Sequence, residues 1–162
     1  MKALFLFLSL AVLSTTIDAR QGGNFGLGAV LGDPTGLSMK YWLRKDNAVS
    51  GALAFGTYRH HYYNDHHDGW YDEEVNIHLH ANYLWHSFSA LPVQRGELPL
   101  YWGAGGRLLM GHDFAMGVRG CGGIEYLPLA PIDIFLELGV IIDFVGHVGG
   151  DVDLGLGLRY FF

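Results

Sequence analysis

The sequence predicts an all-β protein, an eight-stranded antiparallel up-and-down transmembrane β-barrel. Half of the 162 residues are hydrophobic, yet beyond the N-terminal segment no apolar run is long enough for a transmembrane helix. Eight segments instead alternate between apolar residues and polar residues or glycines, as strands with two different faces do. The last of them, LGLGLRYFF, places a large apolar or aromatic residue at every second position. These observations together predict strands that bury one polar face and present one apolar face.

The N-terminal segment, residues 1–19, is expected to be a signal peptide. Lys2 precedes the apolar run ALFLFLSLAVL, and small and polar residues follow up to Ala19. This order of a charge, a short apolar stretch and small residues is that of a secretory signal. Cleavage after Ala19 would leave residues 20–162 as one outer-membrane β-barrel domain. Because Cys121 is the only cysteine, neither an intrachain disulfide nor a lipid anchor at the cleavage site is expected.

The first four strands are expected at residues 24–31, 37–43, 48–58 and 75–87. The first pair is joined by the turn GDPTG, in which Pro34 fixes φ and the glycines tolerate unusual dihedral angles. The second pair is joined by a long segment, residues 59–74. The apolar face of these strands carries Phe25, Leu27, Leu37, Met39, Tyr41, Val49, Leu53, Phe55, Ile77, Leu79, Tyr83 and Trp85.

The last four strands are expected at residues 100–110, 115–126, 134–144 and 152–162. Glycines at 103–106 and 120–123 are expected to allow close packing and curvature within the fifth and sixth strands. In the seventh strand the lipid-facing residues are expected to be Leu136, Leu138, Val140 and Ile142. Glu137 and Asp143 then face the lumen, since a charge on the lipid face costs about 2 to 4 kcal/mol near the membrane midplane.

Alternation alone does not decide which face is outside. A soluble lipocalin-like barrel has the same period, with its apolar residues inside. Here the polar face consists of glycines and isolated charges of both signs, unlike a solvated surface rich in Lys, Glu and Thr. Tyr41, Trp85, Tyr126 and Tyr160 also lie near strand ends on the apolar face, where an aromatic girdle is found in membrane barrels. Both features favour the membrane barrel.

Several stretches resemble a family of small bacterial outer-membrane β-barrels of unknown function, similar to the transmembrane domain of outer membrane protein A. They are GLGAVLGDPTGLSMKYWL (26–43), HANYLWHSF (80–88), ELPLYWGAGGRL (97–108), GVRG (117–120), IDIFLELGVIIDF (132–144) and GLGLRYFF (155–162). The resemblance covers most of the chain after residue 19. It implies the outer membrane of a Gram-negative bacterium, with Leu158, Tyr160 and Phe162 in the terminal assembly signal. The family offers no catalytic residues, and this chain departs from it at Gly120 and Cys121, where Val-Pro is expected.

Charged residues on the polar face are expected to form a paired network that fills the lumen: Lys40, Arg107, Arg119, Glu125, Glu137, Asp143 and Arg159. A buried ion is costly unless it is paired, and eight strands leave little space beyond what side chains fill. Antiparallel order predicts two layers, one with Glu125, Glu137 and Arg159 and the other with Arg107, Arg119 and Asp143. In the first layer Arg159 is expected to neutralise both glutamates. A proton or ion path is the alternative.

The segment RHHYYNDHHDGWYDEE, residues 59–74, is rich in histidine and carboxylates. His60, His61, His66 and His67 could bind zinc or copper, because imidazole and carboxylate are suitable ligands for these ions. The segment lacks a fixed ligand spacing, so a solvated loop or a protein-contact surface is the alternative. No other cofactor is expected. His78 and His80, on the inward face of the following strand, are expected to join the hydrogen-bond network of the lumen.

These features predict a monomer with a structural or surface-interaction role and no catalysis. Its partners would be outer-membrane lipid and the barrel insertion machinery, and the alternative function is binding of an extracellular protein or a transition metal by residues 59–74. The net charge of −6 leaves no basic surface for nucleic acid. A lipid A-modifying enzyme is a lesser alternative, since His86 and Ser87 could suggest acyl hydrolysis. However, His86 is expected to face the lumen at the periplasmic end, far from outer-leaflet lipid.

Overall fold

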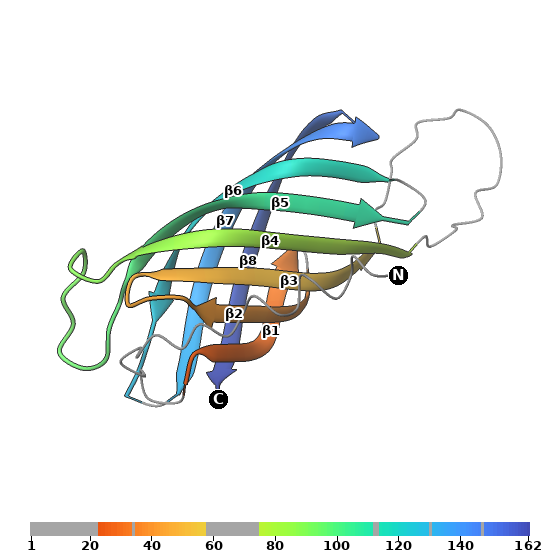
Figure 1. Cartoon of the computed structure of the whole chain (residues 1–162). Helices are drawn as coiled ribbons and strands as arrows, with labels where there is room; N and C mark the ends of the chain where they lie inside the picture. The colour runs from red at the N-terminus through yellow and green to blue at the C-terminus, as the bar shows by residue number, and fades with distance from the viewer. Residues whose placement is uncertain (1–22, 34, 58–74, 112–113, 130, 147) are drawn as a thin grey trace, which may run out of the picture.

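The computed structural model describes residues 23–33, 35–57, 75–111, 114–129, 131–146 and 148–162. They form a closed antiparallel barrel in which each strand pairs with its neighbours in the sequence and β1 pairs with β8 (Figure 1). The strands are β1 (Phe25–Asp33), β2 (Gly36–Trp42), β3 (Asn47–Thr57), β4 (Val75–Ser87), β5 (Leu100–Met110), β6 (Ala115–Tyr126), β7 (Ile132–Gly146) and β8 (Gly149–Phe161). The predicted eight-stranded all-β fold is therefore confirmed. The described residues contain no helix long and apolar enough to cross a membrane.

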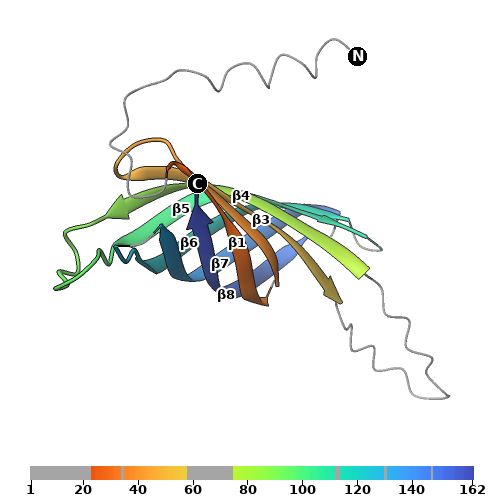
Figure 2. The same cartoon turned by 90° about the horizontal axis from the view of Figure 1, so that it is seen from below.

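The two ends of the barrel differ in what they carry. At one end, here called the terminal end, β1 begins and β8 ends, so that Phe162 N–H donates to the Phe25 carbonyl. In Figure 2 the C-terminus marks this end, and the strands are inclined to one another around the barrel wall. At the other end, here called the loop end, β3 ends and β4 begins. The predicted signal peptide and the histidine-rich segment 59–74 lie outside the described residues.

Two strands are longer than the alternation predicted. β7 begins at Ile132 and β8 begins at Gly149, whereas starts at residues 134 and 152 were expected. The β7–β8 ladder continues through the Asp133–Arg159 and Asp143–Gly149 pairs. Backbone pairing therefore begins earlier than expected in both strands, and it brings Asp133 into the barrel wall.

The outer surface of the barrel is apolar. Leu136, Leu138, Val140 and Ile142 are between 44% and 59% exposed, whereas Glu137 and Asp143 on the same strand are 6% and 3% exposed. The predicted orientation of β7 is therefore confirmed. Tyr41, Trp85, Trp102 and Tyr160 are exposed on the same outer face, close to the terminal end, and Tyr126 is half-buried there.

Inside the barrel, glycines make room for aromatic rings from neighbouring strands. Phe161, Tyr101 and Phe135 are each directly opposite a glycine in the ladder. A Cβ built on Gly26 would lie 2.8 Å from the Phe161 ring, and one on Gly123 would lie 2.5 Å from the Tyr101 ring. Each ring can therefore lie over the backbone of its partner strand. Gly123 belongs to the stretch 120–123 for which close packing was predicted, whereas a Cβ on Gly120 would meet no atom within 4 Å.

Replacing Gly157 by Ala should destabilise the barrel by about 1 to 3 kcal/mol, the usual cost of overpacking a filled interior. The new methyl group would collide with the Phe135 ring and would lie 2.8 Å from the Ala29 carbonyl oxygen. Equilibrium unfolding in denaturant measures the change. Gly120→Ala is the matched control, because a Cβ there meets no atom within 4 Å. Equal effects of the two substitutions would contradict this account of the packing.

Candidate functional site

The lumen is lined by buried charged residues that come from all parts of the chain. The alternation of the strands places Lys40, Arg107, Arg119 and Arg159 inside, where each is at most 5% exposed. Glu125, Asp133, Glu137, Asp143 and Asp153 are buried with them. The seven residues selected from the sequence are thus all buried, and two buried carboxylates, Asp133 and Asp153, were not among them.

Lys40 and Glu125 form an ion pair in the half of the lumen near the terminal end. Lys40 Nζ donates to both carboxylate oxygens of Glu125, at 2.5 and 2.6 Å. His86 lies against the pair, with Nε2 3.0 Å from Lys40 Nζ and 3.2 Å from Glu125 Oε2. The ammonium also lies 4.1 Å from the centre of the Trp42 ring, a cation–π distance. The buried carboxylate is thereby paired and bonded at both oxygens.

The partner of Arg159 differs from the one predicted. Its Nη1 donates to Asp133 Oδ2 at 2.7 Å, and its Nε donates to Ser38 Oγ at 2.9 Å. The guanidinium lies 3.7 Å from the centre of the Phe135 ring. The prediction that Arg159 neutralises Glu125 and Glu137 was therefore wrong about its direct partner. The cause is the start of β7 at Ile132, which turns Asp133 inward beside Arg159 in the ladder.

Nearer the loop end, each of two arginines contacts two carboxylates. Arg107 donates to Asp143 and to Asp151, both at 2.6 Å. Arg119 donates to both oxygens of Asp153 at 2.6 and 2.7 Å, and its Nη2 lies 2.9 Å from Glu137 Oε1. Four carboxylates and two guanidinium groups thus meet among these described residues, so these six side chains carry a net negative charge when all are ionised.

Glu137 joins the two halves of the lumen. Its Oε2 accepts a hydrogen bond of 2.9 Å from the Tyr101 hydroxyl, while its Oε1 contacts Arg119. The predicted division into two layers placed Glu137 with Arg159 and apart from Arg119, and the contact between Glu137 and Arg119 crosses this division. A long arginine side chain reaches across more than one ladder position, so order along the strands does not determine the ion pairs.

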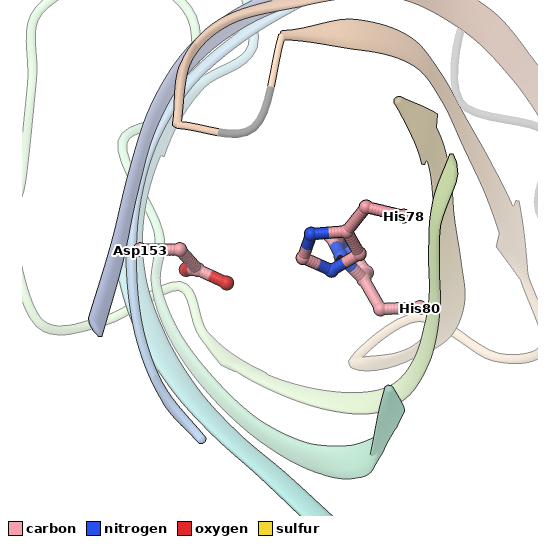
Figure 3. Close-up of side chains that lie close together, drawn as sticks. All are labelled: His78, His80 and Asp153. Atoms are coloured by element: carbon pink, nitrogen blue, oxygen red, sulfur yellow. Dashed lines mark hydrogen bonds between the residues drawn. The ribbon is translucent and has the colours of Figure 1, made fainter. Parts of the chain in front are cut away.

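His78, His80 and Asp153 form a compact group in the same region (Figure 3). The two imidazoles project from β4 on one wall, and the Asp153 carboxylate faces them from β8 on the opposite wall. One ligand atom from each residue lies within 4.8 Å of the other two. His78 and His80 were expected inside the lumen, but their approach to Asp153 was not predicted. The sequence feature that could have indicated this group is the pair of histidines at positions i and i+2, on the inward face of one strand.

A small cavity lies beside this group. Its volume is about 20 Å³, and its lining includes Ser50, His80, Arg119, Glu137 and Asp153. The lining also includes Val30, Ala52 and Phe135, and a space of this size has room for one water molecule. The lumen near His80 is therefore not completely filled by side chains.

The other residues selected from the sequence are placed as follows. His60, His61, His66 and His67 lie outside the described residues. Leu158 and Tyr160 are exposed on the outer face of β8, followed by Phe162 at 68% exposure. His86 is buried against Lys40 and Glu125, whereas Ser87 is next along β4 and has the opposite parity, so the two do not share a strand face.

Similarity to known proteins is found among solved structures. No family model and no curated protein matches the chain. Among solved structures, the chain is similar to Ail, the attachment invasion locus protein of Yersinia pestis, with 15% sequence identity and a TM-score of 0.39. The match covers 85% of this chain and 93% of that one.

Proposed function

We propose that the protein is a small outer-membrane β-barrel of a Gram-negative bacterium with a structural or surface-interaction role. The observation that carries the proposal is that apolar side chains face outward and charged side chains face inward. In an ordinary soluble fold the apolar side chains are inside. Here Leu136, Leu138, Val140 and Ile142 are exposed outward, and ion pairs such as Lys40–Glu125 are buried inside. A closed barrel leaves no unpaired strand edge in lipid, so the described backbone suits a bilayer.

The buried ion pairs support a lumen closed by its own side chains. The pairs link non-adjacent strands, as between β2 and β6 by Lys40–Glu125 and between β6 and β8 by Arg119–Asp153. Crossing the lumen, such pairs occupy the space through which a solute would have to pass. A structural plug is therefore the role proposed for these charges.

An arginine on the outer face tests the membrane placement. Val140→Arg in the protein reconstituted in phosphatidylcholine vesicles should lower the free energy of unfolding by about 2 to 4 kcal/mol, because the charge enters hydrocarbon. Val140 is 54% exposed, so the same substitution on a barrel in water should change stability by about 0.5 kcal/mol or less. Denaturant unfolding with Val140→Leu as the control measures the difference. A barrel that folds in buffer without lipid and tolerates the arginine would refute the membrane placement.

Two further parts of the proposal concern the chain's contacts. The insertion machinery would recognise the outward-facing side chains of Leu158, Tyr160 and Phe162 during assembly, because they are exposed at the terminal end of the barrel. Residues 59–74 would supply the surface for an extracellular protein, since they join β3 to β4 at the end opposite the termini.

A further inference from the structure

We propose that His78, His80 and Asp153 bind a divalent transition-metal ion, for which Zn²⁺ is the best fit, inside the lumen near the loop end. This site is distinct from the histidines of segment 59–74. Its geometry is the same whether lipid or water surrounds the barrel. The two imidazoles and one carboxylate are a common ligand set for zinc, leaving one position for water.

The spacing of the imidazoles is the first support. His80 Nδ1 lies 3.4 Å from His78 Nε2, which is long for a hydrogen bond between nitrogens. Two ligands of a tetrahedral zinc ion, each about 2.0 to 2.1 Å from the metal, lie roughly 3.3 Å apart. The nitrogens are therefore already separated as two ligands of one ion would be. Both imidazoles are buried, at 5% and 8% exposure, and the i and i+2 positions on β4 direct them to the same side.

The carboxylate completes a third position. Asp153 is 5% exposed and reaches toward the imidazoles from the opposite wall (Figure 3), within 4.8 Å of both ligand nitrogens. Asp153 also accepts two hydrogen bonds from Arg119. A carboxylate has about four lone-pair positions, so it can accept from the guanidinium and bind a metal ion at the same time. An arginine bonded to a metal-bound carboxylate orients it, as outer partners of metal ligands commonly do.

The carboxylates in this region outnumber the two arginines that they contact. Arg119 is shared by Glu137 and Asp153, and Arg107 is shared by Asp143 and Asp151. These six side chains carry a net charge of −2 when all are ionised, and a divalent ion at the histidines would offset it. Neutral imidazoles do not offset it, and in a poorly solvated lumen uncompensated charge is expensive.

The small cavity provides the fourth position. At about 20 Å³ and bordered by His80, Asp153 and Ser50, it has room for one water molecule. A zinc ion bound by two histidines, one aspartate and this water would be four-coordinate, which is the usual number for zinc in proteins.

Metal titration of the intact barrel tests the proposal. The protein is purified in detergent from membranes of an expressing bacterium, stripped with a chelator, and titrated with ZnCl₂ by calorimetry. His78→Gln and His80→Gln should each weaken binding by about 100-fold or more, since loss of even an outer partner of a metal ligand costs 10- to 100-fold. A variant with His60, His61, His66 and His67 replaced by Asn is the matched control, and it should keep this site.

The outcomes distinguish zinc binding in the lumen from zinc binding by segment 59–74. Zinc binding that survives both glutamine substitutions, or that disappears in the segment variant alone, would overturn the lumen site. Absence of binding to the wild-type protein would overturn it as well and would leave the imidazoles as part of the hydrogen-bond network. If the glutamine variants fail to fold, anomalous diffraction from zinc-soaked wild-type crystals decides: a peak between His78, His80 and Asp153 supports the proposal, and a peak elsewhere or no peak refutes it.

Discussion

Lys40→Met should lower the free energy of unfolding by about 3 to 5 kcal/mol, the cost of leaving a buried charge without its partner. The Glu125 side chain has no exposed surface, and Lys40 Nζ donates to both of its oxygens. Methionine fills a similar volume but supplies neither charge nor donors. His86 Nε2 still lies 3.2 Å from Glu125 in this variant, which places the expected loss nearer the lower limit. Equilibrium unfolding in denaturant, with the barrel in vesicles, measures it.

Two control variants show whether the loss of stability in Lys40→Met comes from the unpaired charge of Glu125. Glu125→Gln should cost less than Lys40→Met, because the amide oxygen still accepts from Lys40 and the ammonium keeps its contact with the Trp42 ring. The double variant Lys40→Met with Glu125→Leu should recover much of the loss, since a buried ion pair replaced by apolar residues is often nearly neutral. If the double variant is no more stable than Lys40→Met alone, the loss of stability in Lys40→Met comes from packing and not from the unpaired charge.

Arg159→Met is expected to have a similar effect, about 3 to 5 kcal/mol, through a different carboxylate. The substitution removes the ion pair with Asp133, the hydrogen bond to Ser38 and the stacking on Phe135. Arg159→Lys keeps the charge but cannot stack as a planar group, so it should recover only part of the loss.

Double-mutant cycles identify the partner of Arg159. The coupling energy between Arg159→Met and Asp133→Asn should exceed that between Arg159→Met and Glu137→Gln, because Asp133 accepts directly from Arg159 whereas Glu137 contacts Arg119 and Tyr101. A larger coupling with Glu137 would restore the pairing that the order of the strands first predicted.

Some properties of the site were predictable because they depend on local periodicity. In β7, Glu137 and Asp143 face inward among outward leucine, valine and isoleucine residues, as alternation requires. The same rule placed Lys40, Arg107, Arg119, Glu125 and Arg159 in the lumen. Asp133 was not predicted in the lumen because the seventh strand was expected to begin at residue 134, whereas the β7–β8 ladder already includes Asp133.

The sequence by itself determined the number of strands, the face that each turns outward and seven of the buried charges, because these depend on the two-residue period of a single strand. The tertiary structure decided which charges meet. Arg119 contacts Asp153 and Glu137, and neither was expected in its layer. His78 and His80 approach Asp153 although β4 and β8 are not neighbours in the barrel. Contacts across a lumen depend on how far the strands are staggered when the sheet closes. That stagger is a property of all eight strands together, and no single segment of the sequence contains it.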